Sequence, residues 1–126
     1  MVILIKIYSD AGVFKSRICI YDDLLKKRFI SYEKRGKSNN VLEYLALQKA
    51  LRYAIDTYTN DDVQIFSDSQ LIVNQIKGEY KINSLDLFQE CYICKELINP
   101  HIKIFWCPRK LNKAGNILED MYYRER

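Results

Sequence analysis

The stretch Val2-Ile3-Leu4-Ile5-Lys6-Ile7-Tyr8-Ser9-Asp10 is a nearly continuous apolar run that ends in a carboxylate. Such a run, rich in isoleucine, predicts a strand over residues 2–9 that is buried on both faces, as at the centre of an α/β sheet. A second run, Val63-Gln64-Ile65-Phe66-Ser67, also precedes an aspartate, Asp68. Because open α/β sheets bind ligands at the carboxyl ends of their strands, we expect both aspartates to mark a functional edge.

The rest of the chain divides into alternating strand and helix signals. Ala11-Gly12 and Asp22-Asp23 are turn signals, so the first three strands should form an antiparallel meander. The further elements are predicted as strands at 17–21, 28–33 and 102–107, and helices at 41–58, from 69 to Gly78, at 85–98 and from about 112. Ser38, Asn39 or Asn40 can cap the first helix. This order predicts one α/β domain over residues 1–126, with a mixed five-stranded sheet and helices on both faces.

Composition and charge narrow the class of protein. Hydrophobic residues make up 48% of the chain and charged residues 29%, which is typical of a globular domain with a real core. The net charge of +4 suits a polyanionic partner. No segment resembles a membrane span or a signal peptide, so we expect a cytoplasmic protein with reduced cysteines and no membrane partner. No obligate protein partner is evident, and we expect a monomer.

Three carboxylates form the candidate metal site. Asp10 and Asp68 follow the two buried strands, and Glu43 stands early in the first helix. Each has an ordinary structural interpretation: Asp10 as a turn residue, Glu43 as a solvated helix residue and Asp68 as part of a helix cap. Their order and spacing together predict a site for a divalent cation such as Mg²⁺, which prefers hard oxygen ligands.

The flanking residues resemble the type 1 ribonucleases H over nearly the whole chain. The matching segments are Tyr8-Ser9-Asp10, Asn39 to Leu47, Ser67 to Val73 and Pro108 to Asn116. The resemblance implies strand order 3-2-1-4-5, with the fourth and fifth strands parallel to the first. It also implies endonucleolytic cleavage of the RNA strand of RNA–DNA hybrids with two Mg²⁺ ions, leaving 5′-phosphate and 3′-hydroxyl ends.

The chain departs from the family pattern at the last metal ligand. The final aspartate of the pattern falls on Asn116, whose amide oxygen can still ligate a metal but carries no charge. We therefore expect weaker binding of the second ion, with Mn²⁺ able to substitute for Mg²⁺. Glu119 or Asp120 could take over the role. The chain also lacks the mobile-loop histidine, since His101 does not match it, and the extra basic helix of some members, so it resembles the compact form.

The resemblance also implies a set of substrate contacts. Asn39, Asn40 and Gln70 match positions that sense the 2′-hydroxyl of RNA, and Ser38 matches one that meets a DNA phosphate. From the residues themselves, Lys81 is a candidate phosphate contact, and Arg109 and Lys110 could contact the scissile phosphate electrostatically. Asn112 is interpreted as a helix cap.

Other interpretations stay open. A catalytically weak or silent hybrid-binding module would follow if Asn116 disables the site. A 3′–5′ exonuclease is disfavoured because the position two residues after Asp10 is Gly12 and not a glutamate. A zinc site is conceivable from Cys91, Cys94, His101 and Cys107. Trp106 is expected in the core and not as a base-stacking platform.

Overall fold

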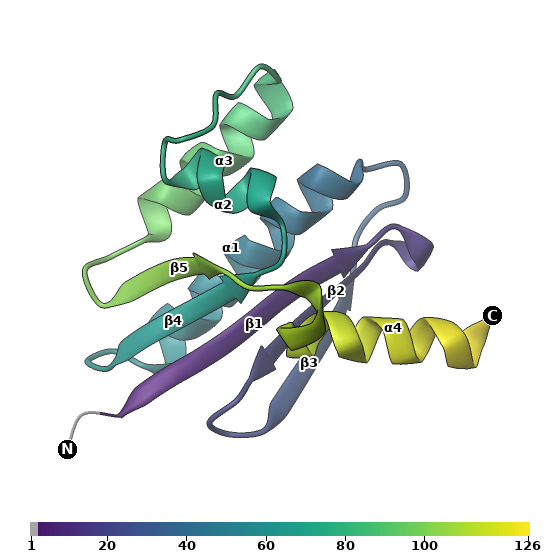
Figure 1. Cartoon of the computed structure of the whole chain (residues 1–126), viewed down its shortest axis with the longest axis horizontal. Coiled ribbons are helices and arrows are strands. Elements are labelled where there is room, and N and C mark those ends of the chain that lie inside the picture. Colours follow the sequence, from purple (N-terminus) through teal and green to yellow (C-terminus); the bar gives the residue numbers. More distant parts are fainter. Residues whose placement is uncertain (1–2) are drawn as a thin grey trace.

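The computed structural model describes residues 3–126, so the predicted start of the first strand at Val2 lies outside the described residues. Figure 1 shows one twisted five-stranded sheet in the order β3-β2-β1-β4-β5. The elements are β1 (Leu4–Gly12), β2 (Arg17–Asp22), β3 (Lys27–Tyr32), α1 (Asn39–Thr57), β4 (Asp62–Ser67), α2 (Gln70–Ile76), α3 (Leu85–Leu97), β5 (Ile102–Trp106) and α4 (Lys113–Glu125), with single 3₁₀ turns at Phe14–Ser16 and Arg109–Leu111. Across residues 3–126, no helix combines the length and apolar character that crossing a membrane requires.

The pairing of the strands confirms the predicted mixed sheet. β1 lies at the centre, antiparallel to β2 and parallel to β4, and β5 is parallel to β4. The two meander connections join antiparallel neighbours, whereas the parallel strands are joined through helices, as parallel pairing requires. The carboxyl ends of β1, β4 and β5 therefore meet at one edge of the sheet.

β1 is longer than the turn signal at Ala11-Gly12 predicted. Ala11 pairs with Ile18 and Gly12 with Arg17, so the strand continues two residues beyond Asp10. The chain reverses instead over Val13 to Ser16, where Lys15 and Ser16 adopt positive φ angles of 59° and 48°. Pairing with β2 thus overrides the local turn signal, and it holds Asp10 in the strand just beyond the point where the pairing of β1 with β4 ends.

Helices lie on both faces of the sheet, as predicted. α1 and α3 pack on one face around a core that includes Ile5, Ile7 and Ile65. α4 crosses the other face over a smaller cluster containing Tyr8, Cys19 and Cys107. α3 buries Cys91 and Cys94 in the core that it shares with α1, whereas its apolar residues Leu85, Phe88 and Tyr92 are exposed.

Two polar networks tie distant parts of the chain together. The buried carboxylate of Asp22, at the end of β2, accepts hydrogen bonds from the Tyr53 and Tyr58 hydroxyls and from the backbone N–H groups of Leu24 and Leu25. In the second network, Glu125 of α4 accepts from Arg17 at 2.7 Å and from Lys15 at 2.8 Å. The first network anchors the β2–β3 turn to α1, and the second anchors α4 to the β1–β2 turn.

Candidate metal centre

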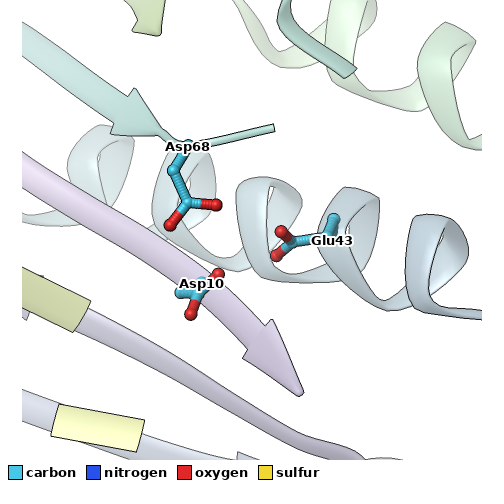
Figure 2. Close-up of side chains that lie close together, drawn as sticks. All are labelled: Asp10, Glu43 and Asp68. Atoms are coloured by element: carbon cyan, nitrogen blue, oxygen red, sulfur yellow. The ribbon is translucent and has the colours of Figure 1, made fainter. Parts of the chain in front are cut away.

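Three carboxylates from three different elements converge at the carboxyl edge of the sheet. Asp10 comes from β1, Asp68 follows β4, and Glu43 projects from the second turn of α1 toward both of them (Figure 2). Each offers a carboxylate oxygen, and these oxygens all lie within 4.8 Å of one another. The structure thus brings together the three carboxylates that the sequence singled out.

The cluster is buried, and its charges face one another. Asp10 is 1% exposed and Glu43 is 6% exposed. Burial and the nearby carboxylate of Asp68 raise the pKa of Asp10 above its usual value. Burial and the two aspartates raise the pKa of Glu43 further still. Two buried carboxylates with raised pKa values beside a third carboxylate, in a site with few compensating groups, are typical of a cation site.

The atoms of Asp10 give a direct test of whether a cation fits. Both of its carboxylate oxygens are buried, and neither has a hydrogen-bond partner within the described part of the chain. A buried, unpartnered carboxylate is costly unless a cation neutralises it. Hard oxygen donors held this close are the ligands that Mg²⁺ and Mn²⁺ accept, so the residues fit a divalent ion.

Asn112 is buried beneath the site and has two functions at once. Its Oδ1 accepts hydrogen bonds from the N–H groups of Ala114 and Gly115, which makes it the N-cap of α4, as predicted. Its Nδ2 donates to the carbonyl of Ser9 and to Oδ2 of Asp68, both at 3.0 Å. Sequence reasoning found the cap but missed the contact with Asp68, for which the only signal was an amide, with donor and acceptor, at the cap position.

The first turn of α4 also comes close to the cluster. A Cβ atom at Gly115 would lie 3.0 Å from Oδ2 of Asp10 and 3.4 Å from Oδ2 of Asp68. The absence of a side chain therefore lets the helix backbone pack directly against the two aspartates. Nothing in the local sequence pattern indicated this approach.

Arg109 is the cation nearest to the cluster. Its Nη1 lies 3.6 Å from Oδ2 of Asp10 and 3.5 Å from Oδ2 of Asp68. The side chain is 59% exposed and reaches the site from the 3₁₀ turn before α4. It can therefore both offset the carboxylate charge and face a ligand that arrives from solvent.

Asn116 is hydrogen-bonded to the turn before α4 and not to the three carboxylates. It is exposed in the first turn of α4, and its Nδ2 donates to the carbonyl of Lys110 at 3.2 Å. Its Oδ1 is left available. The two acids considered as replacements are also exposed: Asp120 pairs with Arg124 at 3.2 Å, and Glu119 lines a cavity of about 240 Å³ that also borders Asp10. Neither acid belongs to the carboxylate cluster.

Trp106 corrects the expectation of a core residue. It is 42% exposed, because β5 is an edge strand and the indole lies at its last position. The indole N–H donates to the backbone carbonyl of Asp68 at 3.1 Å. Trp106 therefore steadies the segment that carries Asp68.

The four residues of the conceivable zinc site do not converge. Cys91 and Cys94 are buried in the core on the α1 and α3 side, and Cys107 belongs to the cluster under α4. His101 is exposed and lies 3.6 Å from Asp62. The sheet separates these groups, so their placement does not favour a shared metal.

The predicted substrate contacts lie at the start of α1, at the start of α2, in the α2–α3 loop and in the turn before α4. Ser38 caps α1 and accepts from the N–H of Val41, and Asn39 and Asn40 are the first two residues of that helix. Gln70 begins α2, immediately after Asp68 and Ser69. Lys81 lies in the loop between α2 and α3, and Lys110 lies in the turn before α4.

The chain was compared with known protein families and with solved structures. Residues 27–121 match the family described as reverse transcriptase-like. The ribonuclease H1 of Halobacterium salinarum NRC-1 is 24% identical, covers 93% of this chain and 98% of its own, and superposes with a TM-score of 0.74.

LC11 ribonuclease H1, isolated from compost by a metagenomic approach, gives a TM-score of 0.75 at 26% identity over 90% of this chain and 91% of its own. The same protein in complex with an RNA/DNA hybrid gives 0.73 at 25% identity, over 90% of this chain and 92% of its own. The family match spans more than half of the chain, and the carboxylate cluster and strand order agree with it. The chain therefore belongs to the reverse transcriptase-like family, within which it is a type 1 ribonuclease H of the compact form.

Proposed function

We propose that this ribonuclease H hydrolyses the RNA strand of RNA–DNA hybrids with two divalent ions, leaving 5′-phosphate and 3′-hydroxyl ends. The observation that carries the proposal is the buried cluster of Asp10, Glu43 and Asp68, with oxygens within 4.8 Å of one another. The hybrid-bound structure of LC11 ribonuclease H1, at 25% identity, supports the choice of substrate.

Asp10, Glu43 and Asp68 would hold the metal ions, with Asn116 as the fourth ligand. When bound, divalent ions of this kind activate the attacking water and stabilise the charge on the phosphate and the leaving oxygen. The chain's own contribution is to preorganise the ligands: Asn112 fixes Asp68 through a hydrogen bond, and the pairing with β2 fixes Asp10 inside the sheet. Mg²⁺ is the expected ion, and Mn²⁺ should substitute for it.

Asn116 is proposed as a weak ligand. Its Nδ2 is engaged with the carbonyl of Lys110, so its Oδ1 is the atom free to face an ion. Replacing the family's aspartate with a neutral amide lowers the formal charge of the ligand set from −4 to −3. The second ion should therefore bind less tightly than in a four-carboxylate site.

Arg109 and Lys110 are proposed to contact the scissile phosphate. Arg109 already lies at the mouth of the cluster, 3.5 Å from Asp68. A guanidinium stays protonated in proteins, so its role is to stabilise negative charge and not to transfer a proton.

Recognition of the hybrid is proposed to use the helix ends around the cluster. Asn39, Asn40 and Gln70 would sense the 2′-hydroxyl of the RNA strand, which distinguishes RNA from DNA. Ser38 and Lys81 would contact phosphates, which fix the position of the duplex without reading its sequence. All five lie on the α1 or α2 ends or on the α2–α3 loop.

Cleavage of a labelled RNA–DNA hybrid, in Mg²⁺ and separately in Mn²⁺, tests the proposal. We expect hybrid-specific cutting with 5′-phosphate ends, and no cutting of single-stranded or duplex RNA. Asp68→Asn should abolish cutting while leaving hybrid binding nearly intact. Cutting that persists in Asp68→Asn would contradict the site.

The alternative is a catalytically silent hybrid-binding module. The specific observation in its favour is Asn116, exposed and hydrogen-bonded to Lys110 at the position of the last aspartate. No cutting in either metal, with hybrid binding intact in a gel-shift assay, would favour this alternative. Recovery of cutting in Asn116→Asp would then identify the position responsible.

A further inference from the structure

One face of the sheet is only partly covered by helix. Figure 1 shows α4 crossing this face near β1 to β3, while nothing lies in front of β4 and β5. The alternating side chains there are Lys6 and Tyr8 on β1, Gln64 and Phe66 on β4, and Lys103 and Phe105 on β5. We call these six residues the outer face. Their neighbours in sequence, such as Ile5, Ile7 and Ile65, point into the core on the opposite side.

The outer face carries a row of aromatic rings in register. Tyr8 pairs with Phe66, and Phe66 with Phe105, and their ring centroids are 5.3 Å and 5.8 Å apart. The ammonium of Lys113 lies 5.9 Å from the Tyr8 ring, and that of Lys77 lies 5.7 Å from the Phe105 ring. A lysine thus flanks the row at each end, and of these two Lys113 is paired with Asp23.

A polar row runs parallel to the aromatic row, two residues further from the metal centre along each strand. Lys6 is opposite Gln64, and Gln64 is opposite Lys103. Because neighbouring strands are about 4.8 Å apart, the backbones of Lys6 and Lys103 are separated by roughly 10 Å. Both lysines are exposed. They form a pair of cations with a neutral hydrogen-bonding group between them.

The charge on this face is not balanced internally. Lys6, Lys77 and Lys103 make no salt bridge within residues 3–126. Of the carboxylates nearby, Asp23 is paired with Lys113 at 2.6 Å and with Lys26 at 3.1 Å. Asp62 lies 3.6 Å from His101, which balances its charge only when the imidazole is protonated, so a single carboxylate faces the three unpaired lysines. The unpaired charge is therefore positive, which complements a polyanion.

We propose that the outer face binds the backbone of single-stranded nucleic acid adjoining the hybrid, an inference that rests on the proposed function. The metal centre lies at the carboxyl edge of the sheet, and the outer face extends away from that edge over β1, β4 and β5. A duplex bound at the edge is too stiff to bend onto this face, since the persistence length of duplex DNA is roughly 150 base pairs. A flexible single strand can do so, with its phosphates on the exposed lysines and its sugars against the half-buried rings of Phe66 and Phe105, whereas Tyr8 is buried under α4.

Binding of a labelled single-stranded DNA oligonucleotide, followed by fluorescence anisotropy with chelator present, tests this surface. Single-stranded DNA lacks the 2′-hydroxyl that the proposed catalytic cleft reads, and chelator prevents cleavage. The test variant is Lys6→Glu/Lys103→Glu. Its matched control, Arg52→Glu/Lys95→Glu, makes the same change in net charge at exposed positions of α1 and α3, which pack on the opposite face.

We expect the Lys6→Glu/Lys103→Glu variant to bind at least about tenfold more weakly at low salt, with the control within about twofold of the unmodified protein. The salt dependence should also fall, because two lost phosphate contacts lower the slope of log K against log salt by about 1.4 for a single strand. Gln64→Glu, which places a negative charge between the two lysines without altering the core, should weaken binding in the same direction. Equal losses in test and control variants, or no loss in either, would overturn the proposal.

A cleavage assay separates this inference from the proposed function. Short blunt hybrids should be cut equally well by the unmodified protein and by Lys6→Glu/Lys103→Glu, whereas hybrids with single-stranded tails should show a raised KM in the variant only. If no hybrid is cut by any form but the anisotropy difference holds, the proposed function fails and the surface stands. If blunt hybrids are cut but tails and single strands make no difference, the surface fails alone.

Discussion

The Nη1 atom of Arg109 lies 3.6 Å from Oδ2 of Asp10, whose two buried oxygens have no hydrogen-bond partner among the described residues. The guanidinium is therefore the counter-ion of the metal-free cluster, and a divalent ion has to compete with it. We expect Arg109→Ala to tighten Mn²⁺ binding to the free protein by about two- to fivefold, the range of a partly exposed ion pair. Calorimetry, or the loss of the free Mn²⁺ signal in electron paramagnetic resonance, measures this.

Lys110→Ala is the matched control, since it removes a neighbouring cation that makes no salt bridge within residues 3–126. Its Mn²⁺ affinity should stay close to that of the unmodified protein. Cleavage should fall in Arg109→Ala despite the tighter metal binding, because the same side chain is proposed to face the phosphate. Unchanged or weaker Mn²⁺ binding in Arg109→Ala would refute the counter-ion role.

Asn116→Asp should strengthen binding of the second metal ion. The new carboxylate would make the formal charge of the ligand set more negative, from −3 to −4. It cannot donate the hydrogen bond to the carbonyl of Lys110, so the side chain becomes free to turn toward the cluster. We expect the Mg²⁺ concentration for half-maximal cleavage to fall several-fold. Asn116→Ala is the control and should raise it. An identical Mg²⁺ dependence in all three forms would mean that position 116 is not a ligand.

Asp10→Asn should abolish cleavage and yet stabilise the metal-free fold. The pKa of Asp10 is raised by burial and by Asp68, so the folded state holds its proton more tightly than the unfolded state does. The free energy of unfolding should therefore fall as the pH rises from about 4, the pKa of Asp10 in the unfolded chain, through its raised pKa in the folded protein. Above that window, the asparagine variant should be about 1–2 kcal/mol more stable in urea unfolding with chelator present. A variant that is less stable than the unmodified protein at alkaline pH would contradict the electrostatic argument.

Asn112 allows its two functions to be separated. Asn112→Ser keeps an oxygen that can cap α4 but loses the donor to Asp68, whereas Asn112→Ala loses both. We expect the alanine variant to lose about 1–2 kcal/mol of stability and the serine variant clearly less. Cleavage should fall to a similar extent in the two variants. Full activity in Asn112→Ser would show that Asn112 only caps α4 and does not position Asp68.

Asp22→Asn should weaken the fold without touching the metal centre. Burial alone would raise the pKa of Asp22, but hydrogen bonds from Tyr53, Tyr58 and the Leu24 and Leu25 backbone lower it below its usual value. The ionised form is thus favoured by folding, and its contribution is present above about pH 4 and lost as pH falls through the folded pKa. We expect a loss of about 2 kcal/mol near neutral pH, shrinking in acid. Asp56→Asn, an exposed substitution on α1, is the control, and a loss independent of pH would point to packing instead.

The parts of the site that the sequence predicted are those encoded by local pattern. Asp10 and Asp68 follow apolar runs, and Glu43 has its place in a helix with a clear cap, so each could be assigned to an edge or a face before any contact was known. The strand order followed from the family resemblance, and the structure confirms it.

The parts that could not be predicted depend on contacts between distant segments. Arg109 and the amide of Asn112 contact carboxylates that belong to distant segments of the chain, and no sequence-spacing rule relates them to Asp10 or Asp68. Trp106 is exposed only because β5 is an edge strand. The extension of β1 beyond Asp10 depends on pairing with β2, which outweighs the turn signal at Ala11-Gly12.

The packing of α4 against β1 has a consequence for biosynthesis. Asn112 bonds to Ser9 across 103 positions of sequence, and Glu125 bonds to Arg17 across 108. A ribosome that has made β1 to β5 has supplied all three carboxylates, but the helix that buries and fixes two of them has yet to emerge from the exit tunnel. Since chains are made at about 5–20 residues per second, a nascent chain spends a second or more in this state. The cutting site of this enzyme is thus completed only when α4 has been made and has packed against β1.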